Sequence, residues 1–404
     1  MARARVLAPG DLTSARTWKA GALRVRVGGR IAQVGRDRIT LADAIGAVVV
    51  YGSGLACEPG DLAVVEGRLD RGVLRQARLL ERTPCPTPRG DGAVSRFAWE
   101  GVAGRLSARA RALAEIRKVL AERGFTEVET PLRVRAPGVD AHIDAVRAEG
   151  GFLVTSPELH LKRLLVGGLP RIFEIARVTR ANERGALHEP EFTLLEWYRA
   201  FAGQEEIQED TEVVVDRVAR ALRGRPELVT AKGHVIDVRP PFPRLTVREA
   251  FRRWAGVRDA SSLAQKDPDR FFELLVGRVE PKLAVLRRPV FLTEYPISEA
   301  ALARPSPDDP SVAERFELYA GGVELSNGYG ELTDALEQER RFRAESARRK
   351  KERRRTYPLD RKFLAALREG MPRAGGNALG LDRLVMLALG AKTVQDVIAF
   401  PAGT

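Results

Sequence analysis

The segment RVTRANERGALHEPEFTLLEWYR, residues 177–199, says most about the fold of this chain, because it sets charged groups inside an apolar-aromatic run. Three other segments share this character: TSPELH (155–160), RFELYAGGVELSNGYGELTDA (315–335) and NALGLDRLVMLALG (377–390). Buried charges are costly unless they are paired with a partner or a ligand. The four segments therefore predict a site that takes a charged substrate.

Arginines and carboxylates recur together in these segments. Arg180 and Arg383 are candidates for binding phosphate, since a guanidinium matches phosphate oxygens geometrically. Carboxylate oxygens are the ligands that Mg²⁺ prefers. The combination favours a nucleoside triphosphate with Mg²⁺, and the sequence has no GxxxxGK[ST] loop to hold the phosphates instead. The candidate carboxylates are Glu158, Glu196, Glu317, Glu324 and Glu331.

Around these segments, residues 96–404 show many short apolar strands and few helices. Residues 107–123 have helical apolar spacing and end at Gly124, whereas no regular alternation of strand and helix follows. This pattern predicts an α+β domain whose antiparallel sheet has helices at its flanks.

The N-terminal part differs in character. Residues 22–80 contain five short strands with Gly-Asp turns, and Leu23, Val25 and Val27 alternate with arginines. We expect a small all-β barrel resembling an OB-fold over residues 1–83, which binds single-stranded nucleic acid or tRNA or is purely structural. Residues 84–95, which include PCPTPRGDG, are the predicted linker.

Composition excludes several classes of protein. The 404 residues are 44% hydrophobic and 30% charged, which is typical of a globular protein, and no apolar run approaches the ~20 residues of a membrane span. Two cysteines without a CxxC pair exclude a disulfide framework and the common structural zinc site. We therefore expect a cytoplasmic protein without a membrane partner.

The net charge of +13 is unevenly distributed. Residues 1–90 hold 15 Lys and Arg against 8 Asp and Glu, and residues 340–355 form a second basic cluster. Such clusters favour an acidic or polyanionic partner. The alternative explanations are an arginine-rich proteome and a solvated charged face.

In their order along the chain, these segments resemble the class II aminoacyl-tRNA synthetases of the lysyl branch. Together with GMP (370–372) and ALGLDRLVMLALGAKTVQDVIAF (378–400), they are most similar to the lysyl-tRNA-synthetase-like ligases that modify elongation factor P. The resemblance covers roughly residues 105–400. It implies the class II antiparallel sheet and a homodimer, since Pro131 resembles the proline of the family's dimer interface.

The resemblance also implies a binding site for ATP and Mg²⁺. Arg180 and Arg383 resemble the catalytic arginines, of which Arg180 holds the α-phosphate, and Phe192 resembles the residue that stacks on adenine. One departure is that the family reads Arg-x-Glu where this chain reads Arg180-Ala181-Asn182-Glu183. The implied ATP-binding residues are Arg180, Asn182, His188, Glu189, Phe192, Glu324, Leu325, Gly380 and Arg383, and the implied metal ligands are Glu317 and Glu324.

The remaining carboxylates are implied to bind the amino acid. Glu158 resembles the residue that takes the α-ammonium, while Glu196, Tyr198 and Glu331 resemble the group that recognises the far ammonium of lysine. A diamino acid needs carboxylates at both ends, because a buried ammonium is costly without a partner. The implied substrate-binding residues are Ser156, Glu158, Glu196, Tyr198, Asn327 and Glu331.

Three functions follow from this resemblance. The first is an ATP-dependent ligase that activates lysine or β-lysine and transfers it to a lysine side chain of elongation factor P. The second is a lysyl-tRNA synthetase that charges tRNA, which the N-terminal barrel favours. The third is a non-catalytic paralogue that keeps the ATP site.

Overall fold

The computed structural model describes residues 5–13, 23–85, 90, 92–138 and 142–402. The chain divides into two compact units, Met1–Ala108 and Arg109–Thr404. Residues 86–89 and 91 of the predicted linker lie outside the described residues, and the boundaries of the predicted domains stay a prediction. No helix in the described part of the chain is long and apolar enough to cross a bilayer.

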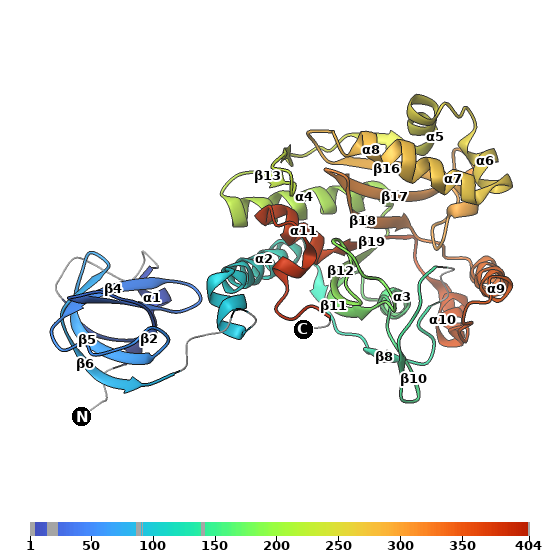
Figure 1. Cartoon of the computed structure of the whole chain (residues 1–404). Helices are drawn as coiled ribbons and strands as arrows, with labels where there is room; N and C mark the ends of the chain where they lie inside the picture. Colours follow the sequence, from blue (N-terminus) through green and yellow to red (C-terminus); the bar gives the residue numbers. More distant parts are fainter. Residues whose placement is uncertain (1–4, 14–22, 86–89, 91, 139–141, 403–404) are drawn as a thin grey trace. The chain divides into compact units, whose positions relative to one another are not determined.

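The first unit is a closed five-stranded barrel (Figure 1). The strands follow the order β2-β3-β4-β6-β5 and close through pairing of β5 with β2; only β4 and β6 run parallel within this ring. Alternate side chains such as Val25, Val27 and Val65 fill its core, as the period-2 pattern predicted. The predicted OB-like barrel is confirmed. Its elements are β1 (Val6–Leu7), α1 (Pro9–Thr13), β2 (Leu23–Val34), β3 (Arg38–Ala42), β4 (Ala47–Gly52), β5 (Leu62–Asp70) and β6 (Val73–Thr83).

The second unit is built on an eight-stranded sheet with the order β15-β16-β17-β18-β19-β12-β11-β7. Its inner strands are antiparallel, and only the pairs at the two edges are parallel. The predicted antiparallel α+β sheet is therefore confirmed. The strands are β7 (Thr126–Glu127), β11 (Arg171–Thr179), β12 (Glu191–Ala200), β15 (Arg244–Thr246), β16 (Val290–Pro296), β17 (Val312–Ala320), β18 (Val323–Gly330) and β19 (Ala374–Gly380).

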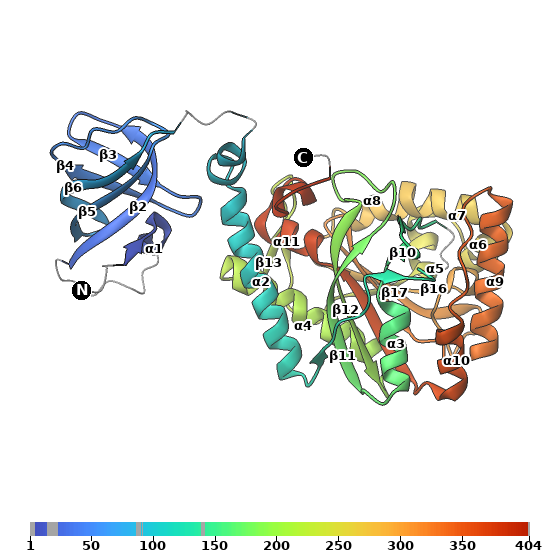
Figure 2. The same cartoon turned by 90° about the horizontal axis from the view of Figure 1, so that it is seen from below.

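Helices cover both faces of this sheet (Figure 2). One face packs against α2 (Val102–Glu122), α4 (Gln204–Arg223) and α11 (Leu381–Leu389) through a large apolar core. In α4 the buried residues Ile207, Val214 and Val218 recur at helical spacing. The helix starts where the Gly203 amide donates to the Glu206 carboxylate and ends at Gly224, whose φ of 76° favours glycine.

The opposite face carries α3 (Glu158–Val166), α9 (Ala335–Lys351) and α10 (Arg361–Gly370), which pack around Phe342 and Phe363. Short helices gather beside β16 in a further apolar cluster. They are α5 (Val247–Ala250), η2 (Phe251–Ala255), α6 (Ala260–Lys266), α7 (Pro268–Leu274), η3 (Leu275–Val279) and α8 (Glu280–Leu283). The other short elements are η1 (Ser95–Trp99), β8 (Arg133–Val134), β9 (Arg147–Ala148), β10 (Gly151–Leu153), β13 (Glu227–Val229), β14 (Val235–Asp237), η4 (Ile297–Glu299) and η5 (Val394–Val397).

Candidate active site

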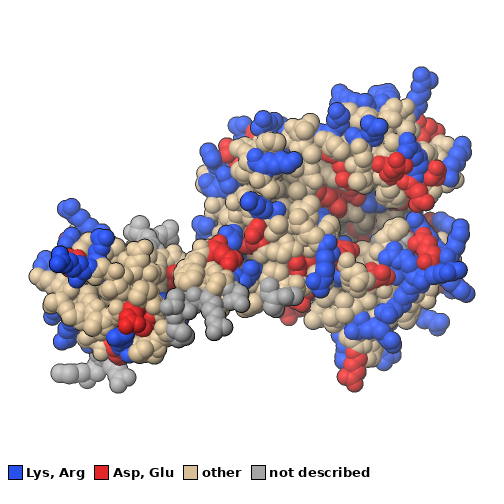
Figure 3. All heavy atoms as spheres, viewed as in Figure 1, with Lys and Arg blue, Asp and Glu red and all other residues tan. Residues whose placement is uncertain are grey.

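A cavity of about 1350 Å³ opens beside the central strands of the sheet, and the first turn of α11 contributes Asp382 and Arg383 to its lining. Strands β12, β18 and β19 form its floor, and α3, α9 and the segment 297–302 form its walls. Figure 3 shows the hollow in the second unit, with acidic side chains at its margin. All four segments singled out in the sequence contribute to its lining.

Successive side chains of β12 point to opposite faces of the sheet, so this strand contributes to both the apolar core and the cavity. Leu195 and Trp197 belong to the apolar core beneath the sheet. Phe192, Glu196 and Tyr198 lie on the opposite face and line the cavity. One strand therefore supplies an aromatic ring at one end of the cavity and a carboxylate at the other.

Two arginines mark the first end of the cavity. The guanidinium carbon of Arg180 lies 5.2 Å from the centre of the Phe192 ring. Nη1 of Arg383 donates to the Glu324 carbonyl oxygen at 2.8 Å, and Nη2 lies 2.7 Å from Nε2 of His188. Partial burial and the neighbouring Arg383 lower the pKa of His188, so the neutral ring accepts this hydrogen bond. These four side chains offer cationic donors and an aromatic face to a nucleotide.

The loop between β11 and β12 carries Asn182, Glu183 and Glu189, which differ in whether they line the cavity. Asn182 is exposed, with a left-handed φ of 68°, and is not among the residues that line the cavity. Glu183 does line it, 3.9 Å from Nη1 of Arg180. Glu189 also lines the cavity, but its carboxylate accepts hydrogen bonds from Gln395 and from the backbone amide of Ala402.

The two predicted metal ligands lie on neighbouring strands. Glu324 faces the cavity with 41% of its side chain exposed, whereas the buried Glu317 accepts hydrogen bonds from Tyr295 at 2.5 Å and Tyr319 at 2.8 Å. Arg315 donates to the other Glu317 oxygen at 2.6 Å. Desolvation in the cavity and the charge of Glu317 raise the pKa of Glu324 to about 7. A divalent cation would relieve this repulsion. Glu317 is not among the residues that line the cavity and its oxygens already accept three hydrogen bonds, so Glu324 is the carboxylate of this pair that Mg²⁺ would reach, with Glu317 behind it.

The second end of the cavity is lined by carboxylates. Ser156 donates to Glu196 at 2.7 Å, and the Tyr198 hydroxyl donates to the same carboxyl group at 3.2 Å. Complete burial, together with the nearby Glu158, raises the pKa of Glu196 to about 8. Such a carboxyl group gains a favourable partner when an ammonium enters the cavity.

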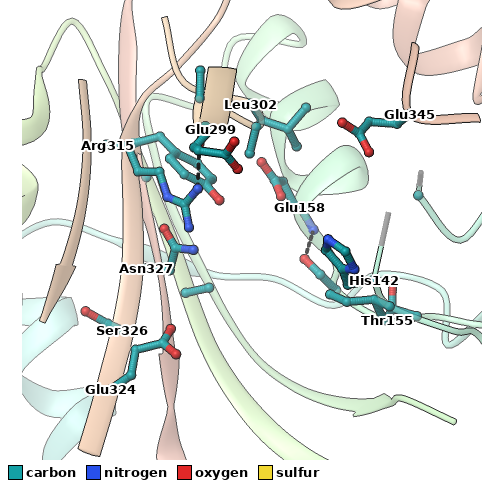
Figure 4. Close-up of a pocket in the computed structure, with 18 of the residues that line it drawn as sticks. His142, Thr155, Glu158, Glu299, Leu302, Arg315, Glu324, Ser326, Asn327 and Glu345 are labelled. Carbon is teal, nitrogen blue, oxygen red and sulfur yellow. Dashed lines mark hydrogen bonds between the residues drawn. The ribbon is translucent and has the colours of Figure 1, made fainter. Parts of the chain in front are cut away.

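The remaining predicted residues lie between these two ends. Asn327 lines the cavity, and its buried Oδ1 atom has no partner among the described residues. Gly380 and Leu325 also line it. Figure 4 shows Arg315, Asn327 and Glu324 along one wall, with Glu158 facing them. Glu331 is fully buried and is not among the lining residues.

The family model for class II tRNA synthetases (D, K and N) matches residues 96–404. The chain belongs to this family. Two curated relatives carry the name elongation factor P–(R)-β-lysine ligase. The Vibrio cholerae protein is 37% identical over 310 residues, which are 74% of this chain and 95% of the relative. The Proteus mirabilis protein is 38% identical over 306 residues, or 72% and 93% of the two chains.

The resemblance to lysyl-branch ligases is therefore confirmed, and this class II synthetase family member is an enzyme of the ligase type. The family match begins at residue 96, so the N-terminal barrel lies outside it. The roles of individual residues are not tested by these comparisons, and they stay predictions.

The structure also adds residues to this class II site that sequence reasoning missed. Lys162 is fully buried, and its Nζ lies 2.6 Å from Glu158 and 2.5 Å from Glu331. Burial alone would lower the pKa of Lys162, but the two carboxylates outweigh it and raise the pKa above its usual value. The four-residue spacing from Glu158 on one helix was the available signal.

Gly376 was missed as well, although it lines the cavity. A Cβ atom at this position would lie 2.3 Å from the Tyr198 ring and 2.6 Å from a Glu331 oxygen. Any side chain here would displace groups at the carboxylate end. The run of glycines at 375–376 was the sequence signal for this close approach.

Proposed function

We propose that this chain activates lysine or β-lysine with ATP and transfers the aminoacyl group to a lysine side chain of elongation factor P. The observation that carries the proposal is a single cavity with arginines and an aromatic ring at one end and buried carboxylates at the other. The names of the two relatives support the choice of substrate and acceptor.

The first step requires no protein base, because the substrate carboxylate is already the nucleophile. Its oxygen forms a bond to the α-phosphorus, the bond to the β-phosphate oxygen breaks, and pyrophosphate leaves. Arg180 neutralises the charge that develops on the α-phosphate, while Phe192 and Arg383 hold the adenine in place. Mg²⁺, held by Glu324 with Glu317, would supply further neutralisation of the phosphates.

In the second step the neutral side-chain amine of the acceptor lysine attacks the carbonyl carbon of the adenylate. A carbon–nitrogen bond forms, the carbon–oxygen bond to the phosphate breaks, AMP leaves, and one proton is released. Asn327 orients the carbonyl group by donating from its Nδ2 amide, since an amide oxygen such as its Oδ1 only accepts hydrogen bonds.

Amine recognition selects the diamino acid. We assign Glu158 to the ammonium nearest the reacting carboxylate, and Ser156, Glu196, Tyr198 and Glu331 to the far ammonium. The burial of Glu196 at the lining of the cavity supports this assignment, because a buried carboxylate binds a cation more strongly than an exposed one. The other nucleotide contacts that we propose are Asn182, His188, Glu189, Leu325 and Gly380.

Charging of tRNA is the second candidate function, and the N-terminal barrel is the feature that favours it. One acceptor assay separates the two. The purified chain receives ATP, Mg²⁺ and radiolabelled lysine or β-lysine, with either elongation factor P or tRNA. We expect label on elongation factor P. Label on tRNA alone would overturn the proposal, and the absence of pyrophosphate exchange would favour a non-catalytic paralogue.

We further propose a homodimer in the cytoplasm, with the barrel at residues 1–83, a linker at 84–95 and the catalytic domain at 96–404. The proline at Pro131 supports the dimer through its resemblance to the family's interface. Light scattering on the purified chain measures the oligomeric state, and a monomer across the working concentration range would contradict this part of the proposal.

A further inference from the structure

Gln338 is a glutamine of α9 whose side-chain amide has no hydrogen-bond partner. The residue is fully buried, and neither Oε1 nor Nε2 forms a hydrogen bond within the described part of the chain. An unpaired buried amide costs free energy, so native proteins keep few of them. Gln338 is also one of the residues that line the cavity. This combination points to a ligand group as the missing partner.

Gln208 of α4, the other buried glutamine among the described residues, shows the usual state of such a side chain. Its Oε1 accepts a hydrogen bond from Nε of Arg244 at 2.6 Å. Gln208 does not line the cavity. The fold therefore pairs the amide of the glutamine that lies away from the cavity and leaves the amide of Gln338 unpaired beside it.

Helical spacing places Gln338 at the carboxylate end of the cavity. Ala335 precedes it by three residues and Phe342 follows it by four, so the three side chains share one face of α9. Ala335 and Phe342 pack in the apolar cluster that also contains Leu159 and Tyr198. Tyr198 belongs to the group that we assign to the far ammonium, so Gln338 lies on the helix face that packs toward this group.

The first turns of α9 are fixed to a neighbouring wall of the cavity. Nη1 of Arg341 donates to the carbonyl oxygens of Ala301 at 3.0 Å and Ala303 at 2.7 Å. In Figure 4, Leu302 of the same segment and Glu158 point into the same part of the cavity. Gln338 thus keeps its position through the helix that carries it, without a hydrogen bond from its own side chain.

The carboxylate end has few free acceptors for a far ammonium, which has three N–H donors. The carboxylate of Glu196 already accepts hydrogen bonds from Ser156 and Tyr198. Glu331 does not line the cavity, and its Oε2 lies 2.5 Å from Nζ of Lys162. An amide oxygen would add an acceptor without adding a further negative charge to this end.

We propose that Gln338 recognises the far ammonium of the substrate and thereby selects a primary amine. This role rests on the proposed function. Oε1 of Gln338 accepts one N–H of the ammonium, and Nε2 donates to a carboxylate oxygen of the same end, where Oε1 of Glu331 also has no hydrogen-bond partner among the described residues. A carboxylate attracts any cation, whereas the amide oxygen requires an N–H group at a fixed place. The substrate class is therefore an amino acid with a second, unsubstituted ammonium group.

The test replaces Gln338 by methionine, which keeps the length of the side chain and removes both polar atoms. Gln338→Met should raise KM for lysine in pyrophosphate exchange roughly 10- to 100-fold, the loss expected for one hydrogen bond to a charged group, and leave KM for ATP unchanged. The preference for lysine over 2-aminoheptanoate, in which a methyl group replaces the ammonium, should fall by the same factor. Gln338→Glu keeps an acceptor oxygen and should have a lower KM for lysine than Gln338→Met.

Thermal stability separates recognition of a ligand from a structural role. Gln338→Met removes two unpaired buried atoms from the free protein, so its Tm should rise by about 2–4 °C. Gln208→Met is the matched control: it loses the hydrogen bond with Arg244, so its Tm should fall while its KM for lysine stays that of the wild type. Lysine added without ATP should raise the Tm of the wild type more than that of Gln338→Met.

The outcomes distinguish this role from the proposed function. A wild-type KM for lysine in Gln338→Met, or a fall in Tm like that of Gln208→Met, would overturn the role of Gln338 and leave the proposed function intact. Equal rises in KM for lysine and for ATP would also overturn it. If lysine neither drives exchange nor raises the Tm of the wild type, the proposed function falls, and the role of Gln338 falls with it.

Discussion

Lys162 and Glu331 form a fully buried ion pair, in which Nζ lies 2.5 Å from Oε2 and neither side chain is exposed. The lysine comes from α3 and the glutamate follows β18, so the pair joins two walls of the carboxylate end. Glu158 is the second partner of the same ammonium. A positive charge built into the chain thus keeps the two carboxylates in place.

Replacing this lysine is expected to destabilise the fold. Lys162→Met leaves two carboxylates without their buried partner, which should lower the free energy of unfolding by about 3–5 kcal/mol in urea titrations. Lys118→Met is the matched control, since Lys118 and Glu122 form an exposed pair at 4.0 Å and should contribute only about 0–1 kcal/mol. Similar losses in the two variants would contradict the importance of the buried pair.

Arg180 is expected to act in adenylate formation. Arg180→Ala should reduce lysine-dependent pyrophosphate exchange by about 100-fold or more, the usual loss when one transition-state charge stabiliser is removed. Arg184→Ala is the control, because Arg184 is exposed on the same loop and is not among the residues lining the cavity. An Arg180→Ala enzyme within a few-fold of the wild type would remove Arg180 from the reacting centre.

Lysine binding should depend on pH through Glu196. Burial, with Glu158 as a second cause, raises the pKa of this carboxyl group to about 8, so it is protonated at neutral pH in the free enzyme. An entering ammonium favours the ionised form, and binding therefore releases a proton. KM for lysine should fall by up to ~tenfold per pH unit until the pH reaches that pKa.

Glu196→Gln supplies the control for this pH profile. The amide keeps the size of the side chain but cannot ionise, so the dependence of KM on pH should flatten while KM itself rises. The folded state binds the Glu196 proton more tightly than the unfolded chain does. The free energy of unfolding of the wild type should therefore fall as the pH rises from the ordinary pKa of the carboxyl group, 4.5, toward about 8. A parallel pH profile in the two proteins would exclude Glu196.

The basic C-terminal end of α9 should influence the acceptor step. Several arginines of this helix are already paired, including Arg340 with Glu337 and Arg343 with Glu339. Lys350 and Lys351 are exposed and form no ion pair among the described residues. Serine at both positions should slow transfer to elongation factor P at low salt and leave the rate of pyrophosphate exchange unchanged. The reason is that charges at the rim of an interface mainly affect the rate at which the two proteins associate.

The salt dependence of transfer checks this prediction. The double variant should show a flatter decline with added salt than the wild type. A variant of equal charge change, Arg278→Ser/Lys282→Ser, should behave like the wild type. If both variants slow transfer equally, the acceptor does not dock at α9.

Deleting residues 1–92 should separate the two enzymatic functions. A ligase for elongation factor P should keep most of its transfer activity, because the family match begins only at residue 96. A lysyl-tRNA synthetase should lose tRNA charging together with the barrel. Retained tRNA charging and lost transfer to elongation factor P would reverse the assignment.

Much of the site was accessible from the sequence because its signals are local. The alternation in β12 separates Leu195 and Trp197 from Glu196 and Tyr198 whatever the rest of the chain does. The period-2 pattern likewise predicted the barrel, since a strand with one apolar face must bury it. The order of the four charged segments then indicated the family.

Contacts between distant segments could not be predicted in this way. Nothing near Glu317 in the sequence indicates that Tyr295 would donate to it, because that contact requires the pairing of β16 with β17. Asn182 and Glu183 are adjacent in the chain, and only the folded loop directs Glu183 toward the cavity and Asn182 toward solvent.

The outer surface of the barrel illustrates the same division. The sequence alone determines that Arg24, Arg68 and Arg75 lie on the outer faces of their strands, because side chains alternate along each strand. Only the tertiary structure decides that they stand side by side with Arg38 and Tyr51, since strand register depends on turns and on pairing between residues far apart in the chain. Local periodicity sets the face of a side chain, and long-range packing sets its neighbours.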